Sequence, residues 1–271
     1  MLKIMTFNIR GASHADGPNA WPLRSALNVQ TIQEIDPAVI GFQEVEAGNL
    51  AVYQQQLPGY ACECGPSASA EEPHQYTAIF WKPELVRRLS AGGFWLSETP
   101  DVLSASWETA CIRTATWVHF QMLGSGVELI HLNTHLDHVS AHARLAGSAL
   151  IIQQLQQITH DYALPVLVTG DFNCDPASPP HRLWLQHDFS DSYLATGHKD
   201  NPQTNTFHAF NWYKPSSSGK TRGDSILRMD WILVRDPAQK IRPLTCEIVH
   251  TARPPLYPSD HFPVVAQLTG L

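Results

Sequence analysis

The sequence predicts an α/β protein that folds as a single domain over residues 1–271. Short strand-like runs alternate with a few helix-like stretches, and the strand patterns continue on both sides of each loop-like stretch. The helices are too few and too unevenly placed for a regular alternation of helices and parallel strands. A chain of 271 residues is also long enough to bury a substantial core without disulfide bonds.

The strand assignments depend on short apolar runs of β-forming residues that end at turn residues. The clearest strand is expected over residues 127–135, where Val127 and Leu129 are typical. Residues 165–169 form another buried run that leads directly into Gly170. Further strands are expected over residues 1–10, 38–42, 77–81, 229–234 and 263–268.

Two helices are expected from apolar residues that recur at spacings of three and four. The clearer helix covers residues 145–158, and Ser140 is a suitable N-cap residue ahead of it. The other covers residues 22–35, and its Pro22 suits the first helical turn. Two polar stretches, residues 62–75 and 196–225, are expected to be loops. The second is unusually long, so we expect it to influence substrate specificity.

Composition excludes several classes of protein. Charged residues make up 16% and hydrophobic residues 43%, a balance that excludes a disordered chain. The formal net charge of -7 argues against a protein that holds long nucleic acid by bulk charge. It still permits an enzyme that meets phosphate only at its active site.

The sequence also predicts a cytoplasmic location. No apolar run approaches the roughly 18 residues needed to cross a bilayer. The first ten residues, MLKIMTFNIR, lack the apolar core of a signal peptide. The five cysteines are scattered and odd in number, which favours free thiols in a reducing compartment. We expect no membrane insertion and identify no protein partner.

Polar side chains gather where the expected strands end. Hard oxygen ligands of this kind suit Mg²⁺ or Mn²⁺. Each motif alone also fits a simple turn or a solvated loop charge, so only the combination indicates a site. The residues in question are Asn8, Glu44, His135, Asp137, Asp171, Asn173, Asp260 and His261.

Asp230 is a candidate site residue for a different reason. It lies within the apolar run Met229-Asp230-Trp231-Ile232-Leu233, where an unpaired buried carboxylate would be costly. A histidine is the natural partner, because the pair fixes the tautomer of the ring and supports its cationic form. We therefore expect Asp230 to be paired with a histidine.

In combination, these motifs resemble the endonuclease/exonuclease/phosphatase family of metal-dependent phosphoesterases, which includes pancreatic-type deoxyribonucleases and inositol polyphosphate 5-phosphatases. The likeness spans nearly the whole chain and is strongest to small bacterial members near the nocturnin-like deadenylases. The matching segments are Thr6-Phe7-Asn8-Ile9-Arg10, Gln43-Glu44, Asn133-Thr134-His135-Leu136-Asp137, Gly170-Asp171-Phe172-Asn173, Met229-Asp230-Trp231-Ile232 and Ser259-Asp260-His261-Phe262-Pro263.

The resemblance implies a fold and a metal site. The fold is a four-layer α/β sandwich, in which two packed mixed β-sheets are flanked by helices and the site lies at one end of the sheets. Glu44 would bind the divalent metal directly, with Asn8 and Asp260 at or next to it. Asp171 would orient or deprotonate the attacking water, with Asn173 beside it.

The remaining roles are implied in the same way. His261 would contact the phosphoryl oxygens or act as the base, oriented by Asp230, and His135 would donate to the phosphate or the leaving group. The resemblance leaves open whether Asp171 or the His261–Asp230 pair is the base. Arg113, Asp137 and His208 are candidate substrate-binding residues, whereas His138 and His142 are expected on the surface.

The expected activity is hydrolysis of a phosphodiester by direct attack of water, with Mg²⁺ or Mn²⁺ and without a covalent enzyme intermediate. The substrate is a nucleic acid in the first hypothesis, as in a nuclease acting on a short or single-stranded end. A hydrolase of small or lipid-derived phosphoesters is the alternative. A catalytically inactive binding scaffold is a further alternative, although the complete set of candidate catalytic residues argues against it.

Overall fold

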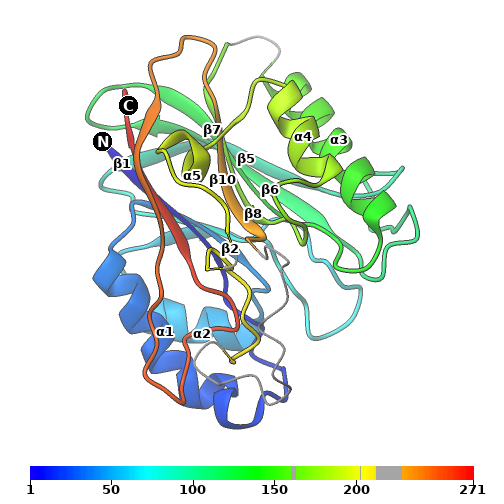
Figure 1. The fold of residues 1–271 in the computed structure, drawn as a ribbon, viewed down its shortest axis with the longest axis vertical. Helices are drawn as coiled ribbons and strands as arrows, with labels where there is room; N and C mark the ends of the chain where they lie inside the picture. The colour runs from blue at the N-terminus through cyan, green and yellow to red at the C-terminus, as the bar shows by residue number, and fades with distance from the viewer. Residues whose placement is uncertain (160–162, 202, 212–227) are drawn as a thin grey trace.

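The computed structural model describes residues 1–159, 163–201, 203–211 and 228–271. Two six-stranded mixed sheets pack face to face, and helices cover their outer faces. Figure 1 shows the four layers, with α1 and α2 below the lower sheet and α3 and α4 beside the upper one. The expected four-layer α/β sandwich is therefore confirmed.

The first sheet contains both ends of the chain. Its strands lie in the order β11 (Arg242–Ile248), β12 (Val264–Thr269), β1 (Leu2–Asn8), β2 (Val39–Gln43), β4 (Ile79–Trp81) and β3 (Ala61–Glu63). Only the β1–β2 pair is parallel. The helices α1 (Trp21–Ile35) and α2 (Ala47–Gln56) pack on the outer face of this sheet.

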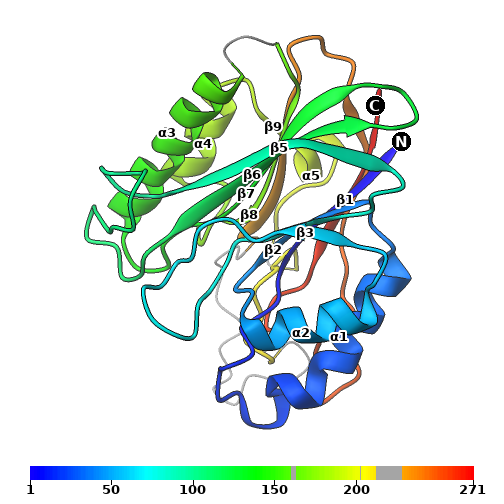
Figure 2. The same cartoon turned by 180° about the vertical axis from the view of Figure 1, so that it is seen from behind.

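The second sheet has the same number of strands and also one parallel pair, β7 with β8. Its order is β5 (Val86–Trp95), β6 (Thr114–Met122), β7 (Glu128–His135), β8 (Val166–Asp171), β10 (Asp230–Arg235) and β9 (Ser190–Asp191). The helices α3 (Ala141–Ile158) and α4 (Pro179–Gln186) cover its outer face, as Figure 2 shows from behind. The short helices η1 (Gly17–Asn19) and α5 (Ser192–Ala195) complete the described elements.

Three apolar clusters occupy the spaces between the four layers. The central cluster joins the facing sides of the two sheets, with Ile4 and Val39 from one sheet and Phe120 and Leu167 from the other. A second cluster lies under α3 and α4, and a third lies under α1 and α2. The alternation of inward and outward side chains along each strand produces these layers, because successive residues face opposite sides of a sheet.

Most expected elements occur close to their expected bounds. The helix expected over residues 145–158 begins earlier, at Ala141, because Ser140 accepts a hydrogen bond from the Ala143 amide and caps the helix there. The loop expected over residues 62–75 overlaps the end of β3, and most of the loop expected over residues 196–225 lies outside the described residues. Among the described residues, no helix is long and apolar enough to cross a membrane.

The two parallel strand pairs bring the candidate residues to one rim of the sandwich. Asn8 ends β1, Glu44 directly follows β2, and His135 and Asp171 end β7 and β8 in register with each other. Asp230 begins the antiparallel strand β10 opposite Asp171. Because the two sheets face each other, these five strand ends converge at one place.

Candidate active site

Asp171 lies at the centre of the converging residues. Its Oδ2 atom accepts a hydrogen bond from Asn8 Nδ2 at 3.0 Å and lies 3.4 Å from His135 Nε2 and 3.7 Å from His261 Nε2. Its Oδ1 atom accepts from the Asn173 amide at 2.9 Å. Burial raises the pKa of Asp171 to about 7, an effect that the charge of His261 opposes and that of Asp230 increases.

The expected partner of Asp230 is His261. His261 Nδ1 lies 2.9 Å from Asp230 Oδ2, and both side chains are buried. Burial alone would lower the pKa of His261, but the charges of Asp230 and Asp171 raise it to about 10. The ring is therefore cationic near neutral pH, with Nε2 directed toward the Asp171 carboxylate.

An acidic wall lies beside this centre. Glu44 Oε1 accepts from Asn8 Nδ2 at 3.0 Å, and Glu44 Oε2 lies 3.2 Å from His14 Nε2. Burial alone would raise the pKa of Glu44, but its hydrogen bonds with His14 and Asn8 hold it well below its ordinary value. Burial raises the pKa of Asp260, and the charge of Glu44 adds to this effect.

The opposite wall carries donors. Arg113 is only 8% exposed, and its guanidinium lies 3.1 Å from His138 Nδ1. Asn173 Nδ2 lies 3.0 Å from His135 Nε2 and donates to the Leu136 carbonyl. Burial, aided by the charge of Arg113, holds the pKa of His135 well below its ordinary value, so this ring is neutral.

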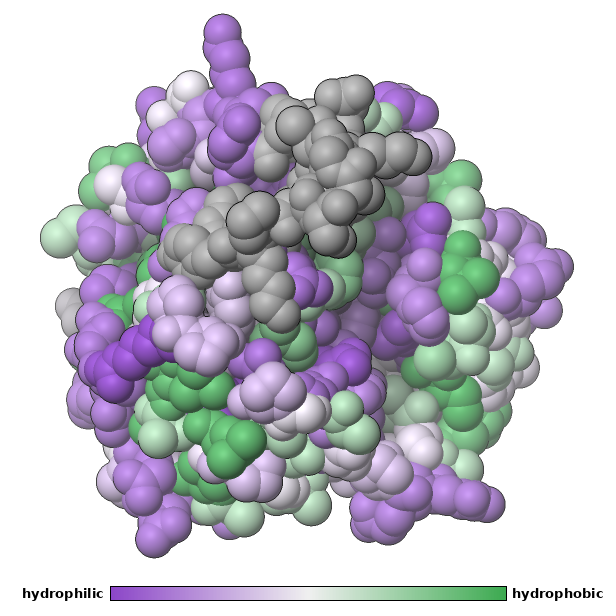
Figure 3. Space-filling model, turned by 60° about the horizontal axis from the view of Figure 1, so that its bottom comes forward, coloured by the Kyte–Doolittle hydropathy of each residue, from purple (hydrophilic) through white to green (hydrophobic). Residues whose placement is uncertain are grey.

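The two walls enclose a cavity of about 360 Å³. The molecular face in Figure 3 is hollowed near its middle, and hydrophilic residues gather around this hollow. The predicted residues that line the cavity are Glu44, Arg113, His135, Asp171, Asn173, Asp260 and His261; the sequence did not indicate the other lining residues, Arg10, His14, Gln75, Cys111, His138 and Phe207.

Asn8 lies beneath the cavity wall and not on it. Its Oδ1 atom accepts from the Arg10 amide at 3.0 Å, and its Nδ2 atom donates to both Glu44 and Asp171. Asn8 therefore orients the two carboxylates in this arrangement. Its backbone carbonyl is held in turn by the Ser259 hydroxyl at 2.7 Å.

Two predicted substrate-binding residues are not on the cavity wall. Asp137 is a loop anchor, because its carboxylate accepts from the Ser140 and Val139 amides on one oxygen and from the Ala110 amide and Thr109 hydroxyl on the other. Burial alone would raise the pKa of Asp137, but these hydrogen bonds lower it to about 2. A substrate could reach it only by breaking them.

His208 is the second of these residues. Its ring packs against Phe262 at 4.1 Å and Tyr257 at 4.8 Å between ring centroids, and it is buried. The neighbouring Phe207 lines the cavity instead and forms an isolated β-bridge with His261. We therefore do not include Asp137 or His208 in the candidate site.

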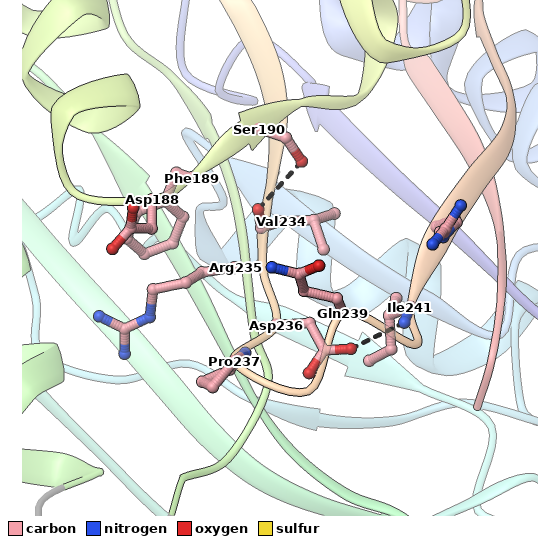
Figure 4. Close-up of a pocket in the computed structure, with 10 residues that line it drawn as sticks. Asp188, Phe189, Ser190, Val234, Arg235, Asp236, Pro237, Gln239 and Ile241 are labelled. Carbon is pink, nitrogen blue, oxygen red and sulfur yellow. Dashed lines mark hydrogen bonds between the residues drawn. The ribbon is translucent and has the colours of Figure 1, made fainter.

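A larger cavity of about 650 Å³ lies at the other end of β10, beside Val234 and Arg235. None of the predicted site residues lines it. Figure 4 shows that its Asp236 carboxylate turns back to the Ile241 amide, so this acid serves the turn between β10 and β11. The chemistry is concentrated in the smaller cavity.

Similarity to known proteins agrees with this arrangement. The model of the Endonuclease/Exonuclease/phosphatase family matches residues 5–261. A mannosyl-6-phosphatase of Bacteroides thetaiotaomicron is 27% identical, with 99% of this chain and 100% of that chain covered and a TM-score of 0.85. A functionally unknown conserved protein of Enterococcus faecalis is 29% identical, with both chains fully covered at 100% and the same TM-score of 0.85.

A more distant likeness concerns the fold alone. The human nocturnin catalytic domain with bound sulfate is 18% identical, with 99% of this chain and 94% of that chain covered and a TM-score of 0.77. The search of curated proteins found no match. The family match across nearly the whole chain and the two close structural likenesses lead to one conclusion: the chain belongs to the endonuclease/exonuclease/phosphatase family of hydrolases.

Proposed function

We propose that the protein is a divalent-metal-dependent phosphoesterase that hydrolyses its substrate by direct attack of water. The observation that carries this proposal is the position of Asp171, whose Oδ2 atom meets Asn8, His135 and His261 at the wall of one cavity. A carboxylate so placed is suited to hold or deprotonate a water molecule. The neighbouring imidazoles are suited to bind the oxygens of a phosphoryl group.

The donor set supports Mg²⁺ or Mn²⁺ as the cofactor. Glu44 and Asp260 place two hard carboxylates on one wall, with Asn8 orienting Glu44 from below. When bound, the cation would neutralise charge on the phosphoryl oxygens. Ligand atoms of Asp171, Asp230 and His261 also lie within 4.8 Å of one another. A cation there would compete with the hydrogen bond between Asp230 and His261, so we assign the metal to Glu44 and Asp260.

The charges favour one division of roles between the two candidate bases. Asp230 stabilises the cationic form of His261, which therefore suits stabilisation of negative charge on the phosphate better than acceptance of a proton. Asp171 is then the group available to accept the proton of the attacking water. The backbone amide of Asn173 donates to Asp171 Oδ1, and its side-chain Nδ2 lies 3.0 Å from His135 Nε2. Asn173 therefore fixes the positions of Asp171 and His135 relative to each other.

The substrate is better described as a small phosphoester than as a long nucleic acid. The cavity is only about 360 Å³, and the cationic Arg10 on its rim is already engaged by Asp16 at 3.1 Å and lies 3.8 Å from Asp260. The mannosyl-6-phosphatase that is 27% identical supports the same class. A nuclease acting on a short end remains the second candidate. We also propose a cytoplasmic location, which the five free cysteines support.

A substrate panel tests the proposal. The panel contains p-nitrophenyl phosphate, bis-p-nitrophenyl phosphate, a hexose phosphate, single-stranded DNA and RNA, each with Mg²⁺, Mn²⁺ or EDTA. We expect metal-dependent turnover that is fastest on a small phosphoester. Fastest turnover on DNA or RNA would favour the nuclease, and no turnover on any substrate would favour the inactive scaffold.

A further inference from the structure

Arg113 is a buried cation without an acidic partner. Its side chain lies on the cavity wall and is more than nine-tenths buried, yet no carboxylate among the described residues lies within ion-pair distance of it. Its Nε atom has no hydrogen-bond partner among these residues. Because an unpaired buried charge is costly, a guanidinium in this position indicates an anionic ligand.

Asp137 is the carboxylate nearest in sequence to His138, the histidine that contacts Arg113, but it is not available to pair with Arg113. Asp137 directly precedes His138, but its two oxygens are used by the amides of Val139, Ser140 and Ala110 and by the Thr109 hydroxyl. The loop therefore keeps Asp137 turned to its own backbone. Within the part of the chain that the structure describes, no carboxylate supplies the negative charge that would balance Arg113, which leaves this position open to an anionic ligand.

His138 is the one side chain that contacts the Arg113 guanidinium by a hydrogen bond among the described residues. A guanidinium has no acceptor, so Arg113 donates and His138 Nδ1 accepts. The contact therefore fixes the neutral tautomer of His138, with the proton on Nε2. His138 also lines the cavity, so the pair offers a planar cation and a second, neutral donor on the same wall.

We infer that Arg113 and His138 bind the terminal oxygens of a phosphomonoester, and that His138 sets a preference for monoesters over diesters. The inference rests on the proposed phosphoesterase function. A monoester has three non-bridging oxygens, so one could reach the cation that Glu44 and Asp260 would hold while others accept from Arg113 and His138. A diester has only two, so its second ester group would leave the buried Arg113 guanidinium or the exposed His138 ring without an anionic oxygen to donate to.

The experiment compares His138→Ala with His142→Ala as a matched control. His142 is the second residue of α3, the helix that follows His138 in the chain; it is exposed, contacts Glu108 and does not line the cavity. We expect His138→Ala to lower kcat/KM for p-nitrophenyl phosphate by about 10- to 100-fold while changing that for bis-p-nitrophenyl phosphate by less than about threefold. The His138→Ala variant should also bind inorganic phosphate more weakly by a similar factor in calorimetry. His142→Ala should match the wild type in all three measurements.

Equal losses on both esters, or unchanged phosphate binding, would overturn the inference. So would a wild-type enzyme that prefers the diester. If the wild type hydrolyses neither ester, the proposed function fails first, and calorimetry with phosphate still decides the role of His138. His138→Gln, which keeps an acceptor for Arg113, should recover part of the phosphate affinity; a variant that behaves like His138→Ala would show that the contact with Arg113 is irrelevant.

Discussion

His261 is held by Asp230 across 2.9 Å, from Nδ1 to Oδ2, and this contact joins the segment ahead of β12 to the first residue of β10. Both residues are buried, and the second oxygen of Asp230 has no hydrogen-bond partner among the described residues. His261 therefore satisfies the buried Asp230 carboxylate, and Asp230 in turn stabilises the cationic form of His261 and orients its ring.

The first prediction concerns this pair. Asp230→Asn removes the negative charge but keeps the shape, so His261 loses much of its cationic character. We expect kcat to fall by roughly 10²-fold or more, with a smaller change in KM. Steady-state kinetics on the best substrate measures this. Asp101→Asn, on the exposed loop after β5, is the control and should behave like the wild type. A wild-type kcat in Asp230→Asn would contradict the pairing argument.

The second prediction concerns metal binding. Glu44→Gln removes one of the two carboxylates assigned to the cation, so the affinity for Mn²⁺ should fall by about tenfold or more. Calorimetric titration of the substrate-free protein with Mn²⁺ measures this independently of turnover. The exposed Glu98 provides the control, because Glu98→Gln should leave the affinity unchanged. Equal affinities in both variants would place the cation elsewhere, with Asp171 and Asp230 as the next candidates.

The third prediction concerns the polar layer between the sheets, directly beneath the site. Gln43 Nε2 donates to Asn133 Oδ1 at 2.7 Å and to Thr6 Oγ1 at 3.1 Å, and all three residues are buried. In Gln43→Leu, Asn133 Oδ1 still accepts from Thr169 Oγ1, but the buried Thr6 hydroxyl loses its Gln43 donor, so the free energy of unfolding should fall by about 1–3 kcal/mol. Denaturant unfolding measures this. Gln54→Leu, on the exposed face of α2, should change stability by less than about 0.5 kcal/mol; equal losses would contradict the network.

The fourth prediction concerns the pH dependence of stability at Asp137. Its hydrogen bonds lower its folded-state pKa from the ordinary 3.8 to about 2. Its stabilising contribution is therefore fully present above about pH 4 and is lost as the pH falls toward 2. The Tm difference between wild type and Asp137→Asn should be largest near neutral pH and shrink below about pH 4. A difference that stays constant from pH 7 to 2.5 would contradict the anchoring role.

The sequence predicted the fold class and most strands because buried strands leave continuous apolar runs. Several elements were missed for physical reasons. The strand β5 contains Gly92 and Gly93 and exposes most of its first half, so its pattern is weak. The helix α2 is short and starts from Glu46, which is an unusual cap residue.

The site was predictable where a polar residue ends a buried strand, as with Asp171 and His135. The expected substrate-binding residues that do not line the cavity lie in loops, where sequence spacing does not show which neighbour faces the cavity. Phe207 and His208 are adjacent, yet only Phe207 lines the cavity, because the loop pairs with His261 across the molecule. Asp137 and His138 are adjacent as well: the acid turns to its own backbone, whereas His138 is exposed, as expected, and also lines the cavity and contacts Arg113.

A metal-dependent reaction centred on Asp171 is tested most directly by the rate at which wild type and Asp171→Asn hydrolyse the best small phosphoester, each with Mg²⁺, with EDTA, and with Mg²⁺ restored. We predict that EDTA abolishes wild-type turnover reversibly and that Asp171→Asn is slower by roughly 10²-fold or more while remaining folded. Turnover that persists in EDTA, or a wild-type rate in folded Asp171→Asn, would contradict a metal-dependent reaction centred on Asp171.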